Sequence, residues 1–279
     1  MNAPRRAGQP GSPLARWYAA NGRHDLAWRQ TRDRWAVLVS EVMLHQTQVP
    51  RVAVVWPSFM ARFPDPATMA AAGPAAVITA WDRLGYPRRA RRLWEAAVRI
   101  TDEGWPDDLT ELPGIGRYTA RAIAAQCDDA DVAAVEVNVR RVVERVEGRR
   151  LTTTEAEDAA VRIARPLRGR DRLLALMDVG ALLCRPREPR CGECPLRRRC
   201  ATRGPLPHEA ARPRQRFEGT FRQRRGHVMA RLRAGPVAAR ELDAEALRSL
   251  VADGLAERDG RYARLPTAGG GGATVARAR

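Results

Sequence analysis

LPGIGRYTARAIA, from Leu112 to Ala124, decides the fold of this part of the chain. Gly114 and Gly116 lie here between two helical stretches. Glycine tolerates positive φ angles and lets a ligand approach the backbone closely. The N-terminus of the helix that follows adds free N–H groups and the positive end of a helix dipole, which together suit a phosphate. The stretch therefore predicts a helical hairpin that binds phosphate, although an ordinary helix–helix turn has a similar pattern.

Helical periodicity continues on both sides of this hairpin. In residues 34–45 the side chains of Trp35, Leu38 and Val42 fall on one face, as in an amphipathic helix. Further helices are expected at about 51–62, 74–83, 88–103, 117–126, 137–146, 154–167 and 170–183. Long strand-like alternation is absent up to residue 183, so the expected fold class is all-α.

A smaller unit is expected near the C-terminus. Residues 206–216 are rich in Pro and Arg and predict a linker. In residues 217–266, two helices at 223–232 and 244–253 precede a hairpin around Asp259-Gly260, which is the order of a winged helix. Residues 267–279 predict a disordered tail.

The composition points to a polyanionic partner. The 279 residues contain 49 basic and 32 acidic side chains, a net charge of +17. All the basic residues are arginine, so no lysine amine is available to form a Schiff base. A genome rich in Arg codons explains arginine over lysine, but not the excess of base over acid. Nucleic acid is the expected partner.

Membrane and secretory roles are not expected. No apolar run approaches the ~20 residues of a membrane span. Residues 1–13 are basic but have no apolar core, so they do not resemble a secretory signal. We expect a cytoplasmic protein.

Four of the five cysteines lie close together. They are Cys184, Cys191, Cys194 and Cys200, with the spacing C-x6-C-x2-C-x5-C, and Cys127 stands apart as an expected core thiol. This pattern indicates a metal site rather than a disulfide framework. Thiolates at this density bind iron–sulfur clusters or zinc. Arginines between the cysteines would face DNA phosphates from a pinned loop, or remain solvated surface charges.

The cysteine spacing resembles the [4Fe–4S] loop of endonuclease III and MutY-type DNA glycosylases. The stretch 112–124 resembles the helix-hairpin-helix motif of the same superfamily. Five further segments resemble MutY-type adenine glycosylases: SEVMLHQTQV (40–49), DLAWRQ (25–30), LGYPRRARRL (84–93), NVRRV (138–142) and MDVGALLC (177–184). The resemblance covers about residues 14–205, and the C-terminal unit resembles that of short, actinobacterial-type members.

This resemblance implies a helix-hairpin-helix glycosylase domain over residues 1–205. Its six-helix part would span about 33–145, and its cluster part would combine 14–32 with 146–205. The Nudix-like domain of long members is not expected, because residues 217–266 are too few for it. A bacterial, nucleoid-associated monomer is implied.

The catalytic residues are also implied by the resemblance. Cleaving an adenine–deoxyribose bond calls for an acid that protonates the base and an anion that stabilises a cationic sugar. The acid would be Glu41. The anion would be Glu136, where relatives carry Asp, and Tyr118 and Asn138 would support it. A packed aromatic and a helix cap are the alternatives for Tyr118 and Asn138.

Residues that contact the base and the duplex follow in the same way. Trp28 and Arg29 would form the wall of the adenine pocket, with Trp28 as plain core the alternative. Gln46 would insert into the duplex when the base flips, beside His45, which replaces a second Gln of the family. Tyr86, Arg88 and Arg89 would contact the DNA backbone near the lesion, and Gly114 and Gly116 the phosphates. Asp178 would touch the pocket or lie on a helix surface.

The expected function is a monofunctional adenine DNA glycosylase that acts on adenine opposite 8-oxoguanine or guanine in double-stranded DNA. Two alternatives stay open. One is a related glycosylase for another mismatched base, favoured by His45 and Glu136. The other is a DNA-binding homologue without catalysis.

Overall fold

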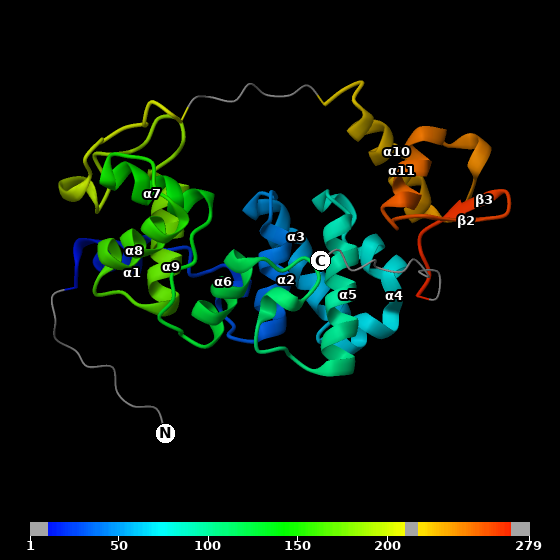
Figure 1. The fold of residues 1–279 in the computed structure, drawn as a ribbon, viewed down its shortest axis with the longest axis horizontal. Coiled ribbons are helices and arrows are strands. Elements are labelled where there is room, and N and C mark those ends of the chain that lie inside the picture. Colours follow the sequence, from blue (N-terminus) through cyan, green and yellow to red (C-terminus); the bar gives the residue numbers. More distant parts are fainter. Residues whose placement is uncertain (1–10, 210–216, 269–279) are drawn as a thin grey trace. The chain divides into compact units, whose positions relative to one another are not determined.

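The computed structural model describes residues 11–209 and 217–268. This part of the chain is mainly helical, and a small sheet lies near its C-terminal end (Figure 1). The α-helices are α1 (Pro13–Asn21), α2 (Arg34–Leu44), α3 (Val49–Arg62), α4 (Pro66–Ala80), α5 (Arg88–Glu103), α6 (Arg117–Cys127), α7 (Val137–Glu147), α8 (Thr153–Ala164), α9 (Gly169–Asp178), α10 (Phe221–Ala234) and α11 (Ala244–Ala252). The strands are β1 (Val237–Ala238), β2 (Glu257–Asp259) and β3 (Tyr262–Arg264). The predicted fold class is confirmed.

Short helical turns connect these elements. They are η1 (Ala27–Arg29), η2 (Asp82–Leu84), η3 (Leu109–Glu111), the π-turn η4 (Val179–Leu183), η5 (Arg197–Arg199) and η6 (Ala239–Glu241). The π-turn η4 continues α9 up to the first clustered cysteine. This explains why the sequence pattern extends as one helix to residue 183.

The described residues divide into two compact units. One contains residues 11–37 and 117–209, and the other residues 38–116 and 217–268. Residues 1–10, residues 210–216 of the expected linker and residues 269–279 of the expected tail lie outside the described residues. The domain boundaries expected from the sequence stay a prediction.

The first unit is built on packed helices α1, α7, α8 and α9. Apolar side chains from all four enter one core, including Leu14, Val143, Ala160 and Leu174. A capping box at Thr152 satisfies the free N–H groups at the start of α8. Helix α1 was not among the expected helices, and the burial of its few apolar side chains in this core stabilises it.

In the second unit α4 packs along α5 (Figure 1). The rings of Phe59, Phe63 and Trp81 meet edge to face in its interior. The helix expected at 74–83 begins where it was predicted, directly after the break at Gly73, and ends at Ala80. The turns from Pro66, which Asp65 caps, are an addition to it. Gly73 interrupts α4 with φ +78°, which explains the weak helical pattern before residue 74.

The C-terminal elements run α10, β1, η6, α11, β2, β3. The strands form an antiparallel sheet in the order β1-β3-β2, with Asp259 opposite Tyr262. Gly260 begins the two-residue turn with φ +57°, a backbone conformation that suits glycine. The expected order of two helices and a hairpin is confirmed, and β1 is an addition to it.

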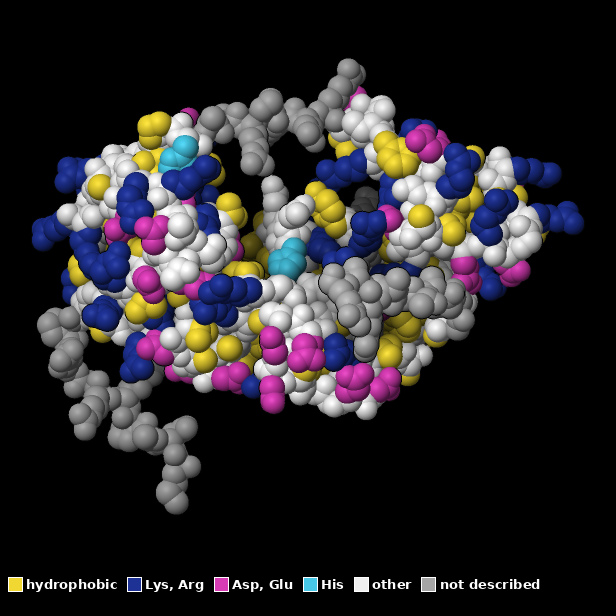
Figure 2. Space-filling model, viewed as in Figure 1, with side chains coloured by type: hydrophobic (Ala, Val, Ile, Leu, Met, Phe, Trp, Pro, Cys, Tyr) yellow, Lys and Arg dark blue, Asp and Glu magenta, His cyan; other side chains and the backbone are white. Residues whose placement is uncertain are grey.

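Arginine side chains are spread over the visible face, and the acidic side chains stand in smaller groups (Figure 2). Among the described residues no helix is both long and apolar enough to cross a membrane.

Candidate active site and cluster loop

Glu136 caps the N-terminus of α7. Its Oε2 accepts hydrogen bonds from the backbone N–H of Asn138 at 2.8 Å and from Nδ2 of Asn138 at 3.0 Å. Its Oε1 accepts from the backbone N–H of Val139 at 3.0 Å. The carboxylate thus satisfies two free N–H groups of the first helical turn. Both of its oxygens are held by the helix that follows.

The half-buried position of Glu136 governs its ionisation. Burial raises the pKa of Glu136 above the ordinary value, while the hydrogen bonds from Asn138 and Val139 and the charge of Arg141 oppose the rise. An anion held by fixed dipoles in a partly dry setting interacts more strongly with a nearby positive charge than one in water. The geometry suits a carboxylate that stabilises a cation.

Asn138 joins Glu136 to a buried arginine. Its Oδ1 accepts a hydrogen bond from Nη2 of Arg141 at 2.7 Å, and the same Nη2 donates to the carbonyl of Gly180, also at 2.7 Å. Nε of Arg141 donates to the carbonyl of Cys184 at 2.6 Å. A continuous path of hydrogen bonds therefore links the predicted second carboxylate to the backbone of the first clustered cysteine.

Tyr118 lies in the first turn of α6. Its ring is half-buried and packs against a small cluster that contains Ala122, Ala134 and Met177. In the turn before α6, Gly114 has φ +82°, and a Cβ at this position would meet the side chain of Arg92 at 3.0 Å. The positive φ and this close approach together explain the glycine at 114. The catalytic role of Tyr118 stays a prediction.

Glu41 is buried in α2, with 4% of its surface exposed. The C-terminal end of α2 is held by Arg89, whose Nη1 donates to the carbonyls of Val42 at 2.7 Å and Met43 at 2.9 Å. Nη2 of Arg89 donates to Oγ1 of Thr47 at 2.9 Å. Burial lowers the pKa of Arg89 to about 10. The guanidinium of Arg89 thus holds the C-terminal end of α2, and its expected contact with DNA stays a prediction.

The segment after α2 carries the predicted wedge. Gln46 is exposed, and its backbone has φ +58°, which is uncommon outside glycine. Burial and the charge of Arg89 lower the pKa of His45, so its imidazole is neutral at pH 7. Tyr86 also has a positive φ, +49°, and its ring is 40% exposed. Arg88 is exposed at the start of α5. Their contacts with DNA stay predictions.

Trp28 and Asp178 are both buried. Trp28 is 3% exposed and Asp178 is fully buried, so the helix-surface alternative for Asp178 is wrong. Arg29 holds the Asp178 carboxylate from Nη1 at 2.7 Å and from Nη2 at 2.9 Å, and Nε of Arg23 adds a contact at 2.7 Å. Burial alone would raise the pKa of Asp178, but Arg29 and then Arg23 outweigh it and hold that pKa below its ordinary value. The Arg29 guanidinium is therefore an internal ion-pair partner.

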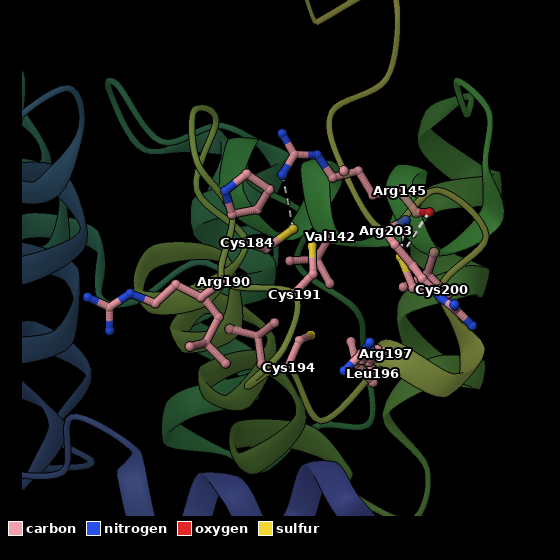
Figure 3. Close-up of a pocket in the computed structure, with 15 residues that line it drawn as sticks. Val142, Arg145, Cys184, Arg190, Cys191, Cys194, Leu196, Arg197, Cys200 and Arg203 are labelled. Carbon is pink, nitrogen blue, oxygen red and sulfur yellow. Dashed lines mark hydrogen bonds between the residues drawn. The ribbon is translucent and has the colours of Figure 1, made fainter.

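The four clustered cysteines line one pocket (Figure 3). They are free thiols, half-buried in the wall that the pocket shares with α7 and η4. Apolar side chains complete the wall, among them Val142, Leu183 and Leu196. Four soft donors that converge on one partly apolar space suit a cofactor with thiolate ligands.

Arg145 stands beside this pocket with only 1% of its surface exposed. Its Nη1 lies 3.4 Å from Sγ of Cys184 and donates to the carbonyl of Arg185 at 2.8 Å. Its Nε donates to the carboxylate of Glu209 at 2.8 Å. Burial raises the pKa of the Cys184 thiol, and the charge of Arg145 beside it opposes that rise.

The donor set fits an iron–sulfur cluster. Among the described residues no three His, Cys, Asp or Glu side chains are grouped closely enough to hold a single metal ion. A [4Fe–4S] cluster takes one thiolate at each of four irons and so tolerates sulfurs that stand further apart than those around one zinc. The four cysteines and the buried cation at Cys184 are compatible with such a group.

Comparisons with known proteins agree with this geometry. Residues 39–166 match the family model described as HhH-GPD superfamily base excision DNA repair protein. The chain is 43% identical to an adenine DNA glycosylase of Mycolicibacterium smegmatis, over 90% of this chain and 94% of that protein. The chain belongs to the adenine DNA glycosylase family. The family expected from the sequence motifs is thereby confirmed.

Another member of the adenine DNA glycosylase family, from Mycobacterium tuberculosis, is also 43% identical, over 92% of this chain and 93% of its own length. Among solved structures, a thermostable thymine-DNA glycosylase superposes with a TM-score of 0.60 at 25% identity. That superposition covers 68% of this chain and 92% of the other. The helical fold is therefore shared with a glycosylase whose name specifies another base.

The internal contacts of Arg89, Arg141 and Arg145 do not follow from the sequence motifs. The motifs place Arg141 in a matching string, assign Arg89 to DNA and do not include Arg145. One available signal was Gly180, because a Cβ there would meet the backbone oxygen of Asn138 at 2.8 Å. A glycine inside a helical pattern indicates such a close approach.

Proposed function

We propose that this chain removes adenine mispaired with 8-oxoguanine or guanine from double-stranded DNA by hydrolysis of the N-glycosidic bond. The observation that carries the proposal is the 43% identity, along nearly the whole chain, to relatives named adenine DNA glycosylase. The net charge of +17 supports a duplex partner. We propose further that the protein acts as a monomer in the bacterial cytoplasm, at the nucleoid.

In the proposed mechanism Glu41 is the general acid. Glu41 is buried in α2, away from bulk water, and in this role its carboxyl group would carry the proton that goes to the base. Protonation of the adenine ring weakens the bond to the sugar and turns the base into a better leaving group.

Glu136 is the proposed anion for the sugar cation. As the sugar gains oxocarbenium character, the capped carboxylate lowers the energy of the positive charge, and water then completes the hydrolysis. Asn138 orients Glu136 through the 3.0 Å hydrogen bond from its amide. Tyr118 supports the same carboxylate in this proposal.

The reaction is proposed to stop at base removal. A lyase step through a side chain requires an amine that attacks the sugar, and the sequence has no lysine. The resemblance to endonuclease III-like glycosylases implies that Tyr118 stands where lyase-competent members carry lysine.

The proposed cofactor is a [4Fe–4S] cluster held by Cys184, Cys191, Cys194 and Cys200. When bound, it would anchor the loop between the cysteines. The chain itself then presents exposed arginines from that loop, including Arg187, Arg197 and Arg198, to DNA phosphates.

A panel of mismatched duplexes tests the function. Each duplex carries A opposite 8-oxoguanine, A opposite G, T opposite G, or no mismatch, and abasic sites are cleaved with alkali after single-turnover incubation. We expect excision only of the two mispaired adenines. Excision of thymine opposite guanine would favour the related glycosylase, and background rates throughout would favour a DNA-binding protein without catalysis.

A further inference from the structure

Two groups of arginines stand out among the C-terminal elements, and Arg222, Arg225, Arg233 and Arg261 belong to neither. In the first group each guanidinium faces a carboxylate. Arg224 lies 3.0 Å from Asp243, and Arg231 lies 2.7 Å from Glu241. Arg264 lies 2.7 Å from Glu257. Their charges are locally neutralised.

Arg240, Arg248 and Arg258 form the second group. No ion pair joins any of them to a carboxylate of the described residues, and all three are exposed. They come from three separate elements, η6, α11 and β2, yet they line the same open hollow. We name this set the arginine hollow: Arg240, Arg248 and Arg258 around an apolar floor that includes Leu247 and Val251.

The carboxylates near the arginine hollow are already engaged. Glu245, on the same helix as Arg248, lies 2.8 Å from Arg224. Asp259, next to Arg258 in the chain, lies 3.1 Å from Arg264. The pairing of acids with the first group leaves a net positive charge in the hollow. Basic side chains project from this unit on the visible face (Figure 2).

We propose that the arginine hollow binds the phosphate backbone of duplex DNA. Guanidinium groups offer forked donors that match phosphate oxygens, and convergence from three elements fixes their relative placement better than mobile charges along one helix would. The apolar floor accepts the sugar faces between phosphates. This inference rests on the proposed function only in that it takes DNA as the partner of the chain.

The test uses the full chain and a labelled undamaged duplex, so that base excision plays no part. The variant Arg240→Gln, Arg248→Gln, Arg258→Gln is compared with the parent over a series of salt concentrations. Each phosphate contact contributes about 0.9 to the slope of log K against log salt, so we expect the slope to become shallower by roughly 2 to 3. Affinity at low salt should fall by about tenfold or more.

A matched control removes three ion-paired charges outside the C-terminal elements: Arg99→Gln, Arg149→Gln, Arg162→Gln. Its slope should change by less than about 1, because these guanidiniums contact carboxylates rather than phosphates. Replacement of the three hollow arginines by lysine should restore most of the slope, since lysine also binds phosphate. Thermal unfolding followed by circular dichroism checks that each variant is folded.

An unchanged slope in the hollow variant would overturn the proposal. The exposed arginines would then be explained by binding of another protein to the arginine hollow. An equal loss in the control would also overturn it, because net charge alone would explain the effect. The two proposals can fail separately. If the parent does not excise adenine, the proposed function is refuted. If the salt slope is nevertheless lost only in the hollow variant, this inference stands.

Discussion

Nδ2 of Asn138 donates a 3.0 Å hydrogen bond to the carboxylate of Glu136, and Oδ1 of the same Asn138 accepts from Arg141. One amide therefore fixes the orientation of an anion on one side and is itself fixed by a buried cation on the other. An amide bound at both ends has a defined rotamer, so the Glu136 carboxylate is held before any substrate arrives.

Glu136→Asp should raise the single-turnover rate on A opposite 8-oxoguanine. Asp retains the charge, is a preferred N-cap residue and is the residue that the family resemblance implies at this position. The carboxylate would move by roughly 1.5 Å, and a misplacement of about 1 Å can cost on the order of 100-fold in rate. Glu136→Gln removes the charge, so its single-turnover rate should be lower than that of the parent. A slower Asp variant would mean that the site is adapted to the longer side chain, and equal rates for all three would remove residue 136 from catalysis.

Glu41→Gln should abolish excision and preserve duplex binding. Glutamine has no proton to deliver to the base, whereas affinity comes mainly from phosphate contacts. Single-turnover excision and binding are measured separately on the same duplex. The control is Glu103→Gln, which changes a 63% exposed side chain. Excision by Glu41→Gln at the parental rate would show that another group is the acid.

Cys194→Ser should remove the cluster. A hard hydroxyl is a poor substitute for a thiolate in an iron–sulfur site, so visible absorption and iron content should fall and DNA binding should weaken. Cys127→Ser is the matched control, because Cys127 is a thiol outside the cysteine pocket whose pKa is raised to about 11 by burial. Stoichiometric zinc without iron in anaerobically prepared parent protein would refute the cluster.

Borohydride trapping should give no covalent adduct with abasic DNA beyond a trace from the N-terminal amine. Trapping requires an imine, and the chain has no lysine to form one. The reaction is run before and after the N-terminal amine is blocked. A strong adduct that survives blocking would contradict a monofunctional enzyme.

Asp178→Asn should lower the free energy of unfolding at pH 7 by about 3 kcal/mol, since it leaves the buried Arg29 without its counter-charge. The pKa of Asp178 is lowered in the folded state. The contribution of its charge is therefore present above the unfolded value of about 4 and is lost as pH falls through the folded value. The gap between parent and variant should shrink below about pH 4 in urea denaturation.

A matched control for this ion pair is Asp128→Asn. Asp128 lies 2.9 Å from Arg34, but both side chains are over 40% exposed. Solvent screens such a pair, so the expected loss is below about 1 kcal/mol. Comparable losses at the two positions would show that burial does not strengthen the Asp178 contact.

Most features that could be predicted from the sequence depend on residues close together in the chain. Periodicity placed most helices, because the contact between positions three and four apart is a property of the helix itself. The cysteine spacing and the glycines before α6 were likewise visible, because each is a constraint within a few residues. Helix α1 escaped notice because its burial depends on Val143 and other side chains far along the chain.

The sequence alone determined the helical class and the cysteine loop, since these depend on residue type and short spacing, and its resemblance to a known family implied the candidate acid. Only the tertiary structure decided which arginines are internal. Arg29 and Asp178 are 149 residues apart in sequence, and Arg89 is 47 residues from Val42, the carbonyl of which it binds. Residue type does not distinguish an arginine that faces DNA from an arginine that neutralises a buried carboxylate. What distinguishes them is the desolvation and the counter-charge that folding brings to each, and those come from residues distant in the chain.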